Sequence, residues 1–328
     1  MNSFGRNFRI TSFGESHGAA VGVIIDGCPA GMKLTVQDIQ PLLDRRRPGT
    51  SPLTSSRDEM DRVEILSGIF EGTTTGAPIA LMVRNINQKS KEYDEIREKF
   101  RPGHADFTYR EKYGIHDYRG GGRSSGRETL GRVAAGAVAV TYLAEHGITI
   151  TGKILKIHGK TKPGEFEQEI MSAKEMGDSV GGIVEITADG CPPGLGDPVF
   201  GKLDALIAGA MMGIGAVKGV EIGDGFGVAG RFGSENNDQM TRDGFLSNHA
   251  GGILGGISSG QEIVVRIAVK PTSSIAKVQQ TRDIHGNVVE LSVGGRHDPC
   301  IVPRIVPVAE AMLALVLMDC WLEQVKYQ

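Results

Sequence analysis

The chain has 328 residues, of which 40% are apolar and 23% are charged, and its formal net charge is −3. Because Lys plus Arg (36) nearly balance Asp plus Glu (39), a globally basic nucleic-acid binder is excluded, and the apolar content excludes an acidic disordered chain. Glycine, with 47 residues, is about twice as common as usual. The glycines follow no G-X-Y period, so we expect tight turns and close backbone approaches rather than collagen.

The cysteines and the apolar runs predict a cytoplasmic protein. Cys28, Cys191, Cys300 and Cys320 form no C-x-x-C pair, and the first residues lack the apolar core of a signal peptide. The longest apolar run, 311–318, is too short to span a membrane. We therefore expect free thiols in a reducing compartment and no membrane association.

In chain order, the first half predicts a strand, a turn, a helix and two further strands. The apolar run 20–25 enters a Pro/Gly turn, and a helix over 35–47 follows. This helix opens with the capping-box pattern Thr35-x-x-Asp38 and ends at Pro48. The two strands that follow are predicted at 62–66 and 78–83, joined by a Gly/Thr turn.

The second half predicts the same series of elements. Three motifs recur in the same order: 26–31 at 189–194, 63–65 at 220–222, and 68–79 at 252–263. The corresponding strand, helix and strands are expected at 182–187, 198–212, 219–222 and 261–269. An insertion at 223–251, rich in Gly, Asn and Asp, is expected to form a surface or active-site loop.

Three matches in register favour internal duplication over chance. We expect one domain, 1–328, with pseudo-repeat halves at about 8–84 and 180–270. The segments 85–179 and 271–328 are then helix and loop additions.

Two further helices are expected in these additions. One covers 128–146 and ends at Gly147, and the other covers 307–326 and is apolar on nearly every face. Helices that are apolar all round are usually buried on both sides. The sequence therefore predicts an α+β fold, a β-α-β layered sandwich with helices packed between antiparallel sheets, and not a doubly wound parallel sheet.

Arginines beside glycine and proline form the first candidate site. Arg45, Arg46 and Arg47 end the first helix, where the helix dipole already favours cations, so a solvated cluster is one interpretation. The rigid turn at Pro48-Gly49 favours the other interpretation, in which fixed guanidinium groups bind phosphate or carboxylate.

A triple-glycine loop, RGGGRSSGRET at 119–129, is the second candidate site. Backbone N–H groups, hydroxyls and guanidiniums that lead into a helix together make an anion cradle. No G-K-[ST] follows, so the loop is not a P-loop, and the polar stretch 109–118 before it does not fit a dinucleotide fingerprint. A phosphate ligand is favoured over a flexible linker.

Three histidines, His17, His104 and His297, stand among glycine, proline and charged residues. Such positions favour placed proton donors over core fillers. No H-x-x-x-H motif or cysteine pair accompanies them, so we expect no metal site. The segment KPTSS at 270–274 is either another anion-binding turn or an ordinary hydrophilic loop.

Taken together, these motifs resemble the chorismate synthase family. They are GESHG at 14–18, DRRRPG at 44–49, RPGHAD at 101–106, RGGGRSSGRET at 119–129, KPTSS at 270–274 and GRHDPC at 295–300. They stand in family order, and the resemblance covers about 8–317. It implies a β-α-β sandwich, a homotetramer and reduced FMN as obligatory cofactor.

The resemblance also implies a reaction, the trans-1,4-elimination of phosphate from 5-enolpyruvylshikimate 3-phosphate to give chorismate. This is the seventh step of the shikimate pathway, which leads to the aromatic amino acids. The substrate carries one phosphate and two carboxylates, which would account for several arginines facing one cavity. Reduced flavin lends electron density and recovers it, so NADPH serves only indirectly, for flavin reduction.

Residue roles follow from the resemblance alone. His17 resembles the acid that protonates the departing phosphate, His104 the group that protonates reduced flavin, and Asp298 the carboxylate involved in proton removal at the flavin. The positions similar to the substrate-binding residues are Ser16, Arg45, Arg46 and Arg127. The positions similar to the FMN-binding residues are Arg46, Arg123, Ser124, Ser125, Gly215, Ala216, Gly255, Lys270, Pro271, Thr272, Ser273, Ser274 and Arg296.

Three positions depart from the family pattern. Many relatives have an arginine, linked to nicotinamide contact, where this chain has Pro52, which argues against built-in NADPH-dependent flavin reduction. Relatives often have Ala and Asn where this chain has Gly126 and Gly215, so only backbone contacts are expected there.

Two other functions remain as alternatives. A phosphotransferase that uses the triple-glycine loop is opposed by the missing G-K-[ST]. An RNA-binding module that uses the arginine clusters is opposed by the net charge of −3 and the 5% aromatic content.

Overall fold

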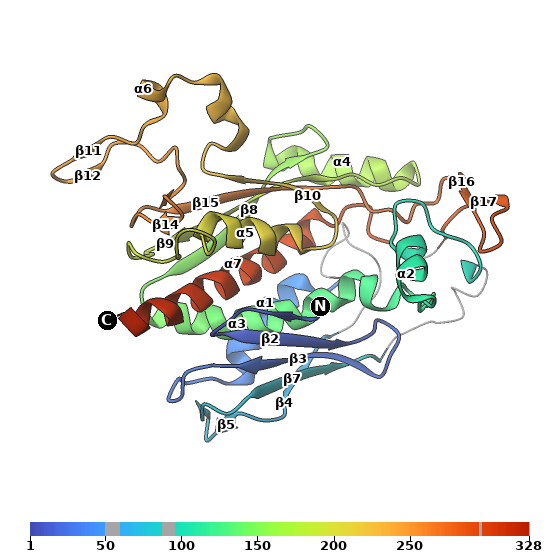
Figure 1. Cartoon of the computed structure of the whole chain (residues 1–328). Helices are drawn as coiled ribbons and strands as arrows, with labels where there is room; N and C mark the ends of the chain where they lie inside the picture. Colours follow the sequence, from blue (N-terminus) through green and yellow to red (C-terminus); the bar gives the residue numbers. More distant parts are fainter. Residues whose placement is uncertain (50–59, 87–95, 295–296, 328) are drawn as a thin grey trace.

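The computed structural model describes residues 1–49, 60–86, 96–294 and 297–327, and it has two main sheets with helices between them (Figure 1). The first sheet is antiparallel, with the order β1-β2-β3-β7-β4. Its strands are β1 (Ser3–Phe4), β2 (Arg9–Gly14), β3 (Ala20–Asp26), β7 (Ile79–Arg84) and β4 (Val63–Ile65). Alternate residues of β7 are buried, as expected of a strand with one face on the core.

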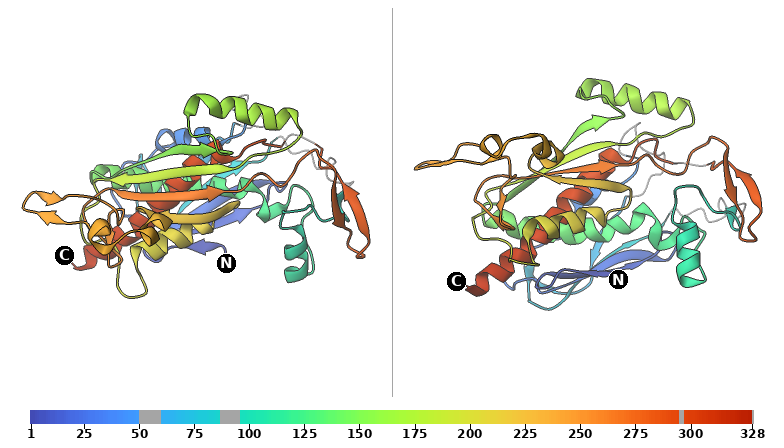
Figure 2. Two further views of the ribbon diagram at one scale, coloured as in Figure 1. Left: turned by 90° about the horizontal axis from the view of Figure 1, so that it is seen from above. Right: turned by 45° about the horizontal axis from the view of Figure 1, so that its top comes forward.

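The second sheet is also antiparallel, with the order β10-β15-β9-β8. Its strands are β10 (Val217–Ile222), β15 (Ile263–Val269), β9 (Gly182–Asp189) and β8 (Thr149–Ile157). Burial alternates along most of β15 in the same way. Helix α4 (Pro163–Glu175) lies on the outer side of this sheet, as the views in Figure 2 show.

The helix layer holds the shared core of both sheets. It consists of α1 (Val36–Arg46), α3 (Thr129–Glu145), α5 (Leu203–Met212) and α7 (Val302–Gln324). Helix α7 packs on α3, α5, β8 and β9, and α3 packs on α1 and β3. A Cβ on Gly136 would lie 2.3 Å from the Cβ of Ala311, so glycine is needed where α3 meets α7. The predicted sandwich of helices between antiparallel sheets is confirmed.

Helix α7 is long and apolar enough to cross a membrane, and it alone is so among the described helices. However, 83% of its most apolar window is buried inside the protein. It is therefore accounted for as the central helix of the core, in keeping with its two-sided apolar surface.

Two helix boundaries differ from the prediction. Helix α5 begins at Leu203 rather than at 198, because the chain first makes a turn in which the N–H of Asp197 donates to the carbonyl of Gly201 (3.1 Å). Helix α7 begins at Val302 rather than at 307, because Pro303 occupies its first turn, where a missing N–H costs nothing. Pro307 lies inside the helix.

The two main sheets share one topology. After β3 and after β9 comes a helix of the middle layer, and a small hairpin precedes β7 and β15 in turn. The hairpins are β5 (Ile69–Phe70) with β6 (Thr73–Thr74) and β13 (Ile253–Leu254) with β14 (Ile257–Ser258). The order β2-β3-β7-β4 in the first sheet corresponds to the order β8-β9-β15-β10 in the second, so that β3 matches β9 and β7 matches β15.

Equivalent hydroxyls also make equivalent bonds in the two halves. Thr74 donates to the carbonyl of Pro29 (2.7 Å) and accepts from the N–H of Met32 (3.0 Å). Ser258 donates to the carbonyl of Pro192 (2.6 Å) and accepts from the N–H of Leu195 (2.8 Å). Each hydroxyl therefore joins a hairpin to the Pro/Gly turn that follows a central strand.

The remaining elements lie outside the layers. They are α2 (Asp106–Tyr113), η2 (Gly122–Ser124), η3 (Gly126–Glu128), η4 (Gly225–Gly230), α6 (Gly233–Asn236), β11 (Met240–Thr241), β12 (Gly244–Phe245), β16 (Gln279–Arg282), β17 (Val288–Leu291) and η5 (Val325–Tyr327). The insertion 223–251 projects at the end of the molecule opposite α2 (Figure 1). The four cysteines are buried and free.

Candidate active site

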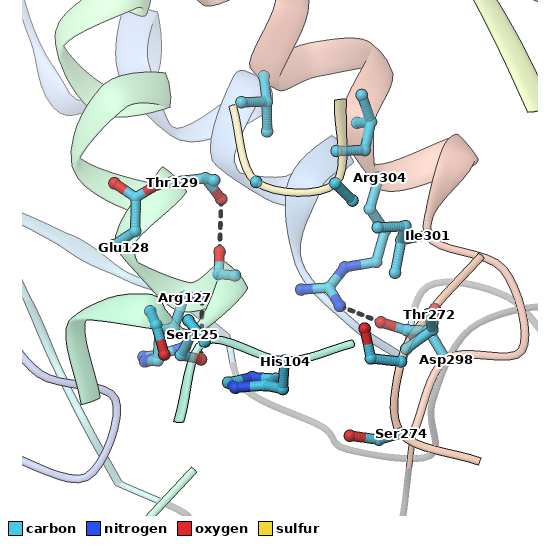
Figure 3. A pocket seen from close by; sticks show the side chains of 18 of the residues that line it. His104, Ser125, Arg127, Glu128, Thr129, Thr272, Ser274, Asp298, Ile301 and Arg304 are labelled. Carbon is cyan, nitrogen blue, oxygen red and sulfur yellow. Dashed lines mark hydrogen bonds and ion pairs between the residues drawn. The ribbon is translucent and has the colours of Figure 1, made fainter. Parts of the chain in front are cut away.

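A cavity of about 620 Å³ opens where α1 ends and α3 and α7 begin (Figure 3). Its volume lies within the range of about 300–1,000 Å³ that is usual for small-molecule sites. Segments far apart in the sequence line it: 46–48, 101–105, 120–132, 213–216, 270–274 and 297–308. All the candidate motifs except 14–18 therefore contribute to one wall or another.

The lining is strongly cationic. Among the described residues it contains six arginines and one lysine against two carboxylates. These residues are Arg46, Arg101, Arg123, Arg127, Arg132, Arg304, Lys270, Glu128 and Asp298. The N-terminus of α3 also faces the cavity through Thr129, which adds the positive end of a helix dipole. Such a cavity suits a ligand with several negative charges.

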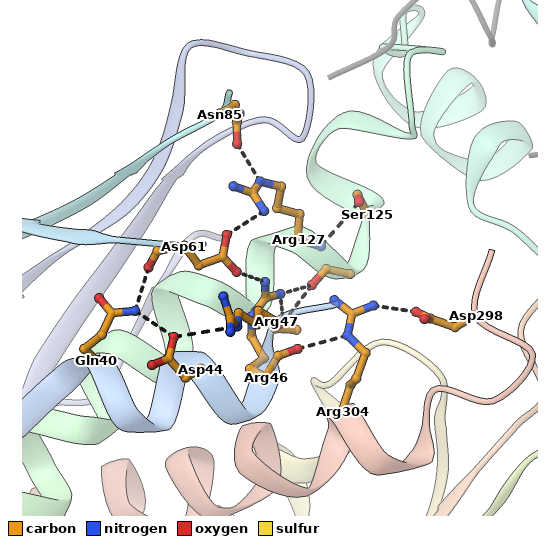
Figure 4. A network of polar contacts seen from close by, with 12 residues as sticks. Gln40, Asp44, Arg46, Arg47, Asp61, Asn85, Ser125, Arg127, Asp298 and Arg304 are labelled. Carbon is orange, nitrogen blue, oxygen red and sulfur yellow. Dashed lines mark hydrogen bonds and ion pairs between the residues drawn. The ribbon is translucent and has the colours of Figure 1, made fainter. Parts of the chain in front are cut away.

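A buried carboxylate joins two of these arginines (Figure 4). The Asp61 side chain is fully buried, and it accepts from Nη2 of Arg46 (2.6 Å) and from Nη1 of Arg127 (3.0 Å). Burial alone would raise the pKa of Asp61, but the charges and hydrogen bonds of Arg46 and Arg127 lower it below its usual value. Asp61 thus remains ionised and fixes the spacing of two guanidiniums.

The same network continues to the other wall of the cavity. Arg304, on α7, donates through Nε to the carbonyl of Arg46 (2.9 Å) and through Nη1 to the carboxylate of Asp298. Burial lowers the pKa of Arg304, but a guanidinium keeps its charge in proteins. Asp298 therefore enters the cavity as a carboxylate held by a cation (Figure 4).

His104 lines the cavity in front of another buried ion pair. Its Nδ1 lies 2.9 Å from Oδ1 of Asp106, and Asp106 is paired with Arg101 at 2.7 Å. The side chains of Arg101 and Asp106 are each 4% exposed, whereas His104 is 18% exposed. The ring of His104 is thus anchored from behind and open on the cavity side (Figure 3).

The triple-glycine loop passes directly over both predicted catalytic histidines. A Cβ on Gly120 would lie 2.4 Å from Cε1 of His17, and a Cβ on Gly121 would lie 2.8 Å from Cε1 of His104. The φ angles of +64° and +84° also favour glycine. His17 is buried behind Gly120, beside the hydroxyl of Ser16 (3.1 Å from its Nδ1).

The serines and the arginine of this loop are also held in place. Arg123 donates to the hydroxyl of Ser12 (2.7 Å) and to the carbonyl of Gly14 (3.2 Å), which ties the loop to β2. The hydroxyl of Ser124 donates to the carbonyl of Gly121 (2.7 Å), and that of Ser125 accepts from the N–H of Arg127 (3.3 Å). Ser125 therefore caps the short helix η3.

The segment 270–274 closes the opposite side of the cavity. Lys270 donates through Nζ to the hydroxyl of Ser273 (2.6 Å) and to the carbonyl of Gly103 (3.1 Å). Burial, with a smaller contribution from Lys218, lowers the pKa of Lys270. The hydroxyl of Thr272 is buried in the wall and has no hydrogen-bond partner among the described residues, so it is available to a ligand or to water.

The structure does not bring every predicted residue to the cavity. The guanidinium of Arg45 makes two bonds (2.7 and 2.9 Å) to the buried Glu310 of α7 and lies outside the lining. Gly255 lies in the hairpin β13–β14, away from the cavity, and no residue of the insertion lines it. Ser16 and His17 lie behind the glycine loop, whereas Arg296 and Pro52 lie outside the described residues.

Four residues of the site were missed by sequence reasoning. Arg101 and Asp106 stood inside the motif at 101–106, where a carboxylate two residues after a histidine was the available signal. Asp61 and Arg304 had no such signal, because the first stands in none of the motifs and the second lies in an apolar helix. Their roles appear only once the chain is folded.

Fold and site together define an enzyme-like protein, an α+β sandwich with one strongly cationic cavity for a polyanionic small molecule. The family model described as chorismate synthase matches residues 8–322. A chorismate synthase from Syntrophobacter fumaroxidans is 54% identical, with 97% of this chain and 96% of the relative covered. A crystal structure of chorismate synthase superposes with a TM-score of 0.78 at 34% identity, covering 98% of this chain and 93% of that one.

The chain therefore belongs to the chorismate synthase family. Its reaction is that of the family, a lyase reaction that eliminates phosphate from 5-enolpyruvylshikimate 3-phosphate to give chorismate, in aromatic biosynthesis. The family requires FMN.

Proposed function

We propose that the cavity holds 5-enolpyruvylshikimate 3-phosphate and reduced FMN side by side and carries out the elimination between them. The observation on which this rests is the convergence of Arg46, Arg123, Arg127 and Lys270 with His104 in one cavity. Two anionic guests need many cations in a site from which water is largely excluded. Asp61 is shared by Arg46 and Arg127, and no carboxylate pairs with Arg123 or Lys270 among the described residues, so the cavity keeps positive charge for its guests.

The residues present fit a flavin phosphate and ring. Polar groups gather on one side of the cavity, and the buried hydroxyl of Thr272 there lacks a partner among the described residues. The residues that would hold FMN are Arg123, Ser124, Ser125, Gly215, Ala216, Lys270, Pro271, Thr272, Ser273 and Ser274. When bound, reduced FMN supplies electron density that helps the allylic phosphate depart and takes it back afterwards.

The substrate anions are assigned to Arg46 and Arg127, which Asp61 holds at a fixed spacing. Protonation of the departing phosphate is assigned to His17, whose ring lies behind Gly120 and outside the lining, with its Nδ1 held by the hydroxyl of Ser16. His104 donates a proton from the cavity side. Asp298, which is paired with Arg304, is assigned the role of proton acceptor.

The assembly and the compartment are further parts of this proposal. We propose a homotetramer in the cytoplasm, bound to neither nucleic acid nor membrane, with NADPH used only indirectly to reduce the flavin. Phe200, Phe226 and Phe232 are 96%, 81% and 77% exposed in one chain, which supports contacts between copies. The shared topology and turn bonds of the two main sheets support one domain built from two duplicated halves.

The test is phosphate release under anaerobic conditions with reduced FMN and the phosphorylated substrate. H104Q and H17Q should each lower kcat by about 10²–10⁴-fold, because each removes a proposed proton donor. H285Q, which alters an exposed histidine at the turn before β17, is the matched control and should match the wild type. Wild-type rates in both H104Q and H17Q would reject these assignments.

A further inference from the structure

The carboxylate of Asp106 is surrounded by hydrogen-bond donors. Its Oδ2 accepts from the backbone N–H of Arg101 (3.2 Å) and from Nε of the same residue (2.7 Å). Its Oδ1 accepts from Nη2 of Arg101 (2.7 Å) and lies 2.9 Å from Nδ1 of His104. Both oxygens are therefore committed, and the whole cluster is buried behind the imidazole.

These contacts decide which ring nitrogen of His104 carries the proton. Burial would raise the pKa of Asp106, but hydrogen bonds from Arg101 and His104 hold it well below its usual range, so the group is a pure acceptor. A contact of 2.9 Å between Nδ1 and this carboxylate requires a proton on Nδ1. Nη2 of Arg101 has two N–H groups and lies 3.1 Å from Nδ1, but an unprotonated Nδ1 would set its lone pair against the anionic Oδ1 only 2.9 Å away, so the carboxylate decides and Nδ1 carries the proton.

We propose that Asp106 is a positioning residue that keeps the Nδ1 proton of His104 on the protein side and leaves Nε2 as the proton-exchanging atom on the cavity side. The inference rests on the proposed proton role of His104. Both hydrogen-bond contacts of the ring are at Nδ1, and no described residue bonds to Nε2. Gly121 closes over Cε1 at a distance that allows no side chain, which helps to hold the ring.

The proton balance follows from this arrangement. The imidazolium of His104 gives up the proton on Nε2 to a base in the cavity, so the Nε2–H bond breaks and the neutral ring retains Nδ1–H. Asp106 stabilises that tautomer through its Oδ1. The next proton enters at Nε2 from solvent, and Nδ1–H is never exchanged during the cycle.

The variant D106N distinguishes this role from simple packing. An asparagine has one amide nitrogen, and at the Oδ2 position it would face two donors from Arg101. At the Oδ1 position it faces one donor and can itself donate to Nδ1 of His104, so that orientation is favoured. D106N should therefore invert the tautomer of His104, with the proton on Nε2 and none on Nδ1.

The experiment is ¹⁵N NMR of the full-length protein labelled at histidine, with the His104 signal assigned by its loss in H104Q. At a pH high enough for the ring to be neutral, the wild type should show Nδ1–H with a bare Nε2, and D106N should show the reverse. T108A is the control, because among the described residues this exposed hydroxyl bonds to the carbonyl of Ala105 alone, near the same helix start, and its loss should leave the tautomer unchanged. A wild-type tautomer with the proton on Nε2 would overturn the inference without any variant.

Turnover then separates this inference from the proposed function. In the reduced, FMN-loaded enzyme, D106N should lower kcat by about 10²–10⁴-fold while KM for the substrate stays within about threefold. If the tautomer inverts and kcat is unchanged, Asp106 positions the ring but the proton role proposed for His104 fails. If the tautomer does not invert, the positioning role fails whatever the turnover.

Discussion

The ends of α1 and α5 occupy equivalent places in the two halves, yet they bring opposite properties to the same cavity. Helix α1 ends at Arg46, which contributes charge, and Pro48 follows it in the cavity wall. Helix α5 is followed by Gly213, Gly215 and Ala216, which contribute backbone and open space. The turns make the same bonds in both halves, whereas the helix ends that face the cavity differ.

This difference would allow one cavity to bind the two guests proposed above. Charged side chains need room to reach their ligand, and a second arginine cluster at the end of α5 would fill that room and repel the first. Small residues there let the backbone approach the ligand closely. The end of α1 therefore supplies charge and the segment after α5 supplies space, and each contribution can be removed by its own substitution.

The largest effect is expected from removing Asp61, the carboxylate that holds Arg46 at the end of α1 and Arg127. D61A should lower the free energy of unfolding by about 3–5 kcal/mol, because it leaves the buried guanidiniums of Arg46 and Arg127 without their counter-ion. Urea denaturation measures this loss.

D44A is the matched control for that experiment. Asp44 also stands near Gln40, but its side chain is 48% exposed, so its loss should cost less than about 1 kcal/mol. Equal costs for D61A and D44A would mean that the buried network does not stabilise the charged half.

The limits of sequence reasoning follow the same division. The capping box at Thr35 and Asp38, the Pro/Gly turns and the apolar helices depend on local chemistry, so the layered fold was predictable. The motifs at 101–106 and 119–129 could also be recognised from neighbouring residues, and both line the cavity.

Partners from distant segments could not be predicted in this way. Arg45 and Arg46 are adjacent and identical in type, but the helix turns one toward Glu310 and the other toward Asp61. A rotation of about 100° per residue separates neighbours on a helix, so only the packing of α1 against α3 and α7 decides which guanidinium meets the cavity. Asp61 and Arg304 belong to the site for equally non-local reasons.

The second prediction concerns Gly215, which lines the cavity in the open segment after α5. G215L should weaken FMN binding by about 10–100-fold, because a Cβ at Gly215 meets no protein atom within 4 Å and the larger side chain would enter the cavity. The dissociation constant, measured by flavin titration, is the readout.

The control is the same substitution six residues earlier. Gly209 is exposed on α5 and also has open space at its Cβ, so G209L should leave FMN binding unchanged. Both variants should unfold at nearly the urea concentration of the wild type, which would show that G215L acts on binding. Equal FMN affinities in G215L and G209L would contradict the assignment of Gly215 to the cofactor side.

The smallest effects are expected for Thr74 and Ser258, whose hydroxyls make equivalent bonds in the two halves. T74V and S258A each delete a buried hydroxyl that bonds a proline carbonyl and a backbone N–H, and each leaves those two groups unsatisfied. Each should lower the free energy of unfolding by about 1–2 kcal/mol, with kcat unchanged because neither residue lines the cavity.

T73V, which removes an exposed hydroxyl that accepts from Lys33, is the control and should cost less than about 0.5 kcal/mol. Costs for T74V and S258A that agree within about 1 kcal/mol would mean that these turns stabilise both halves alike. A cost for only one of them would show that the two halves differ in their scaffold as well as at the cavity.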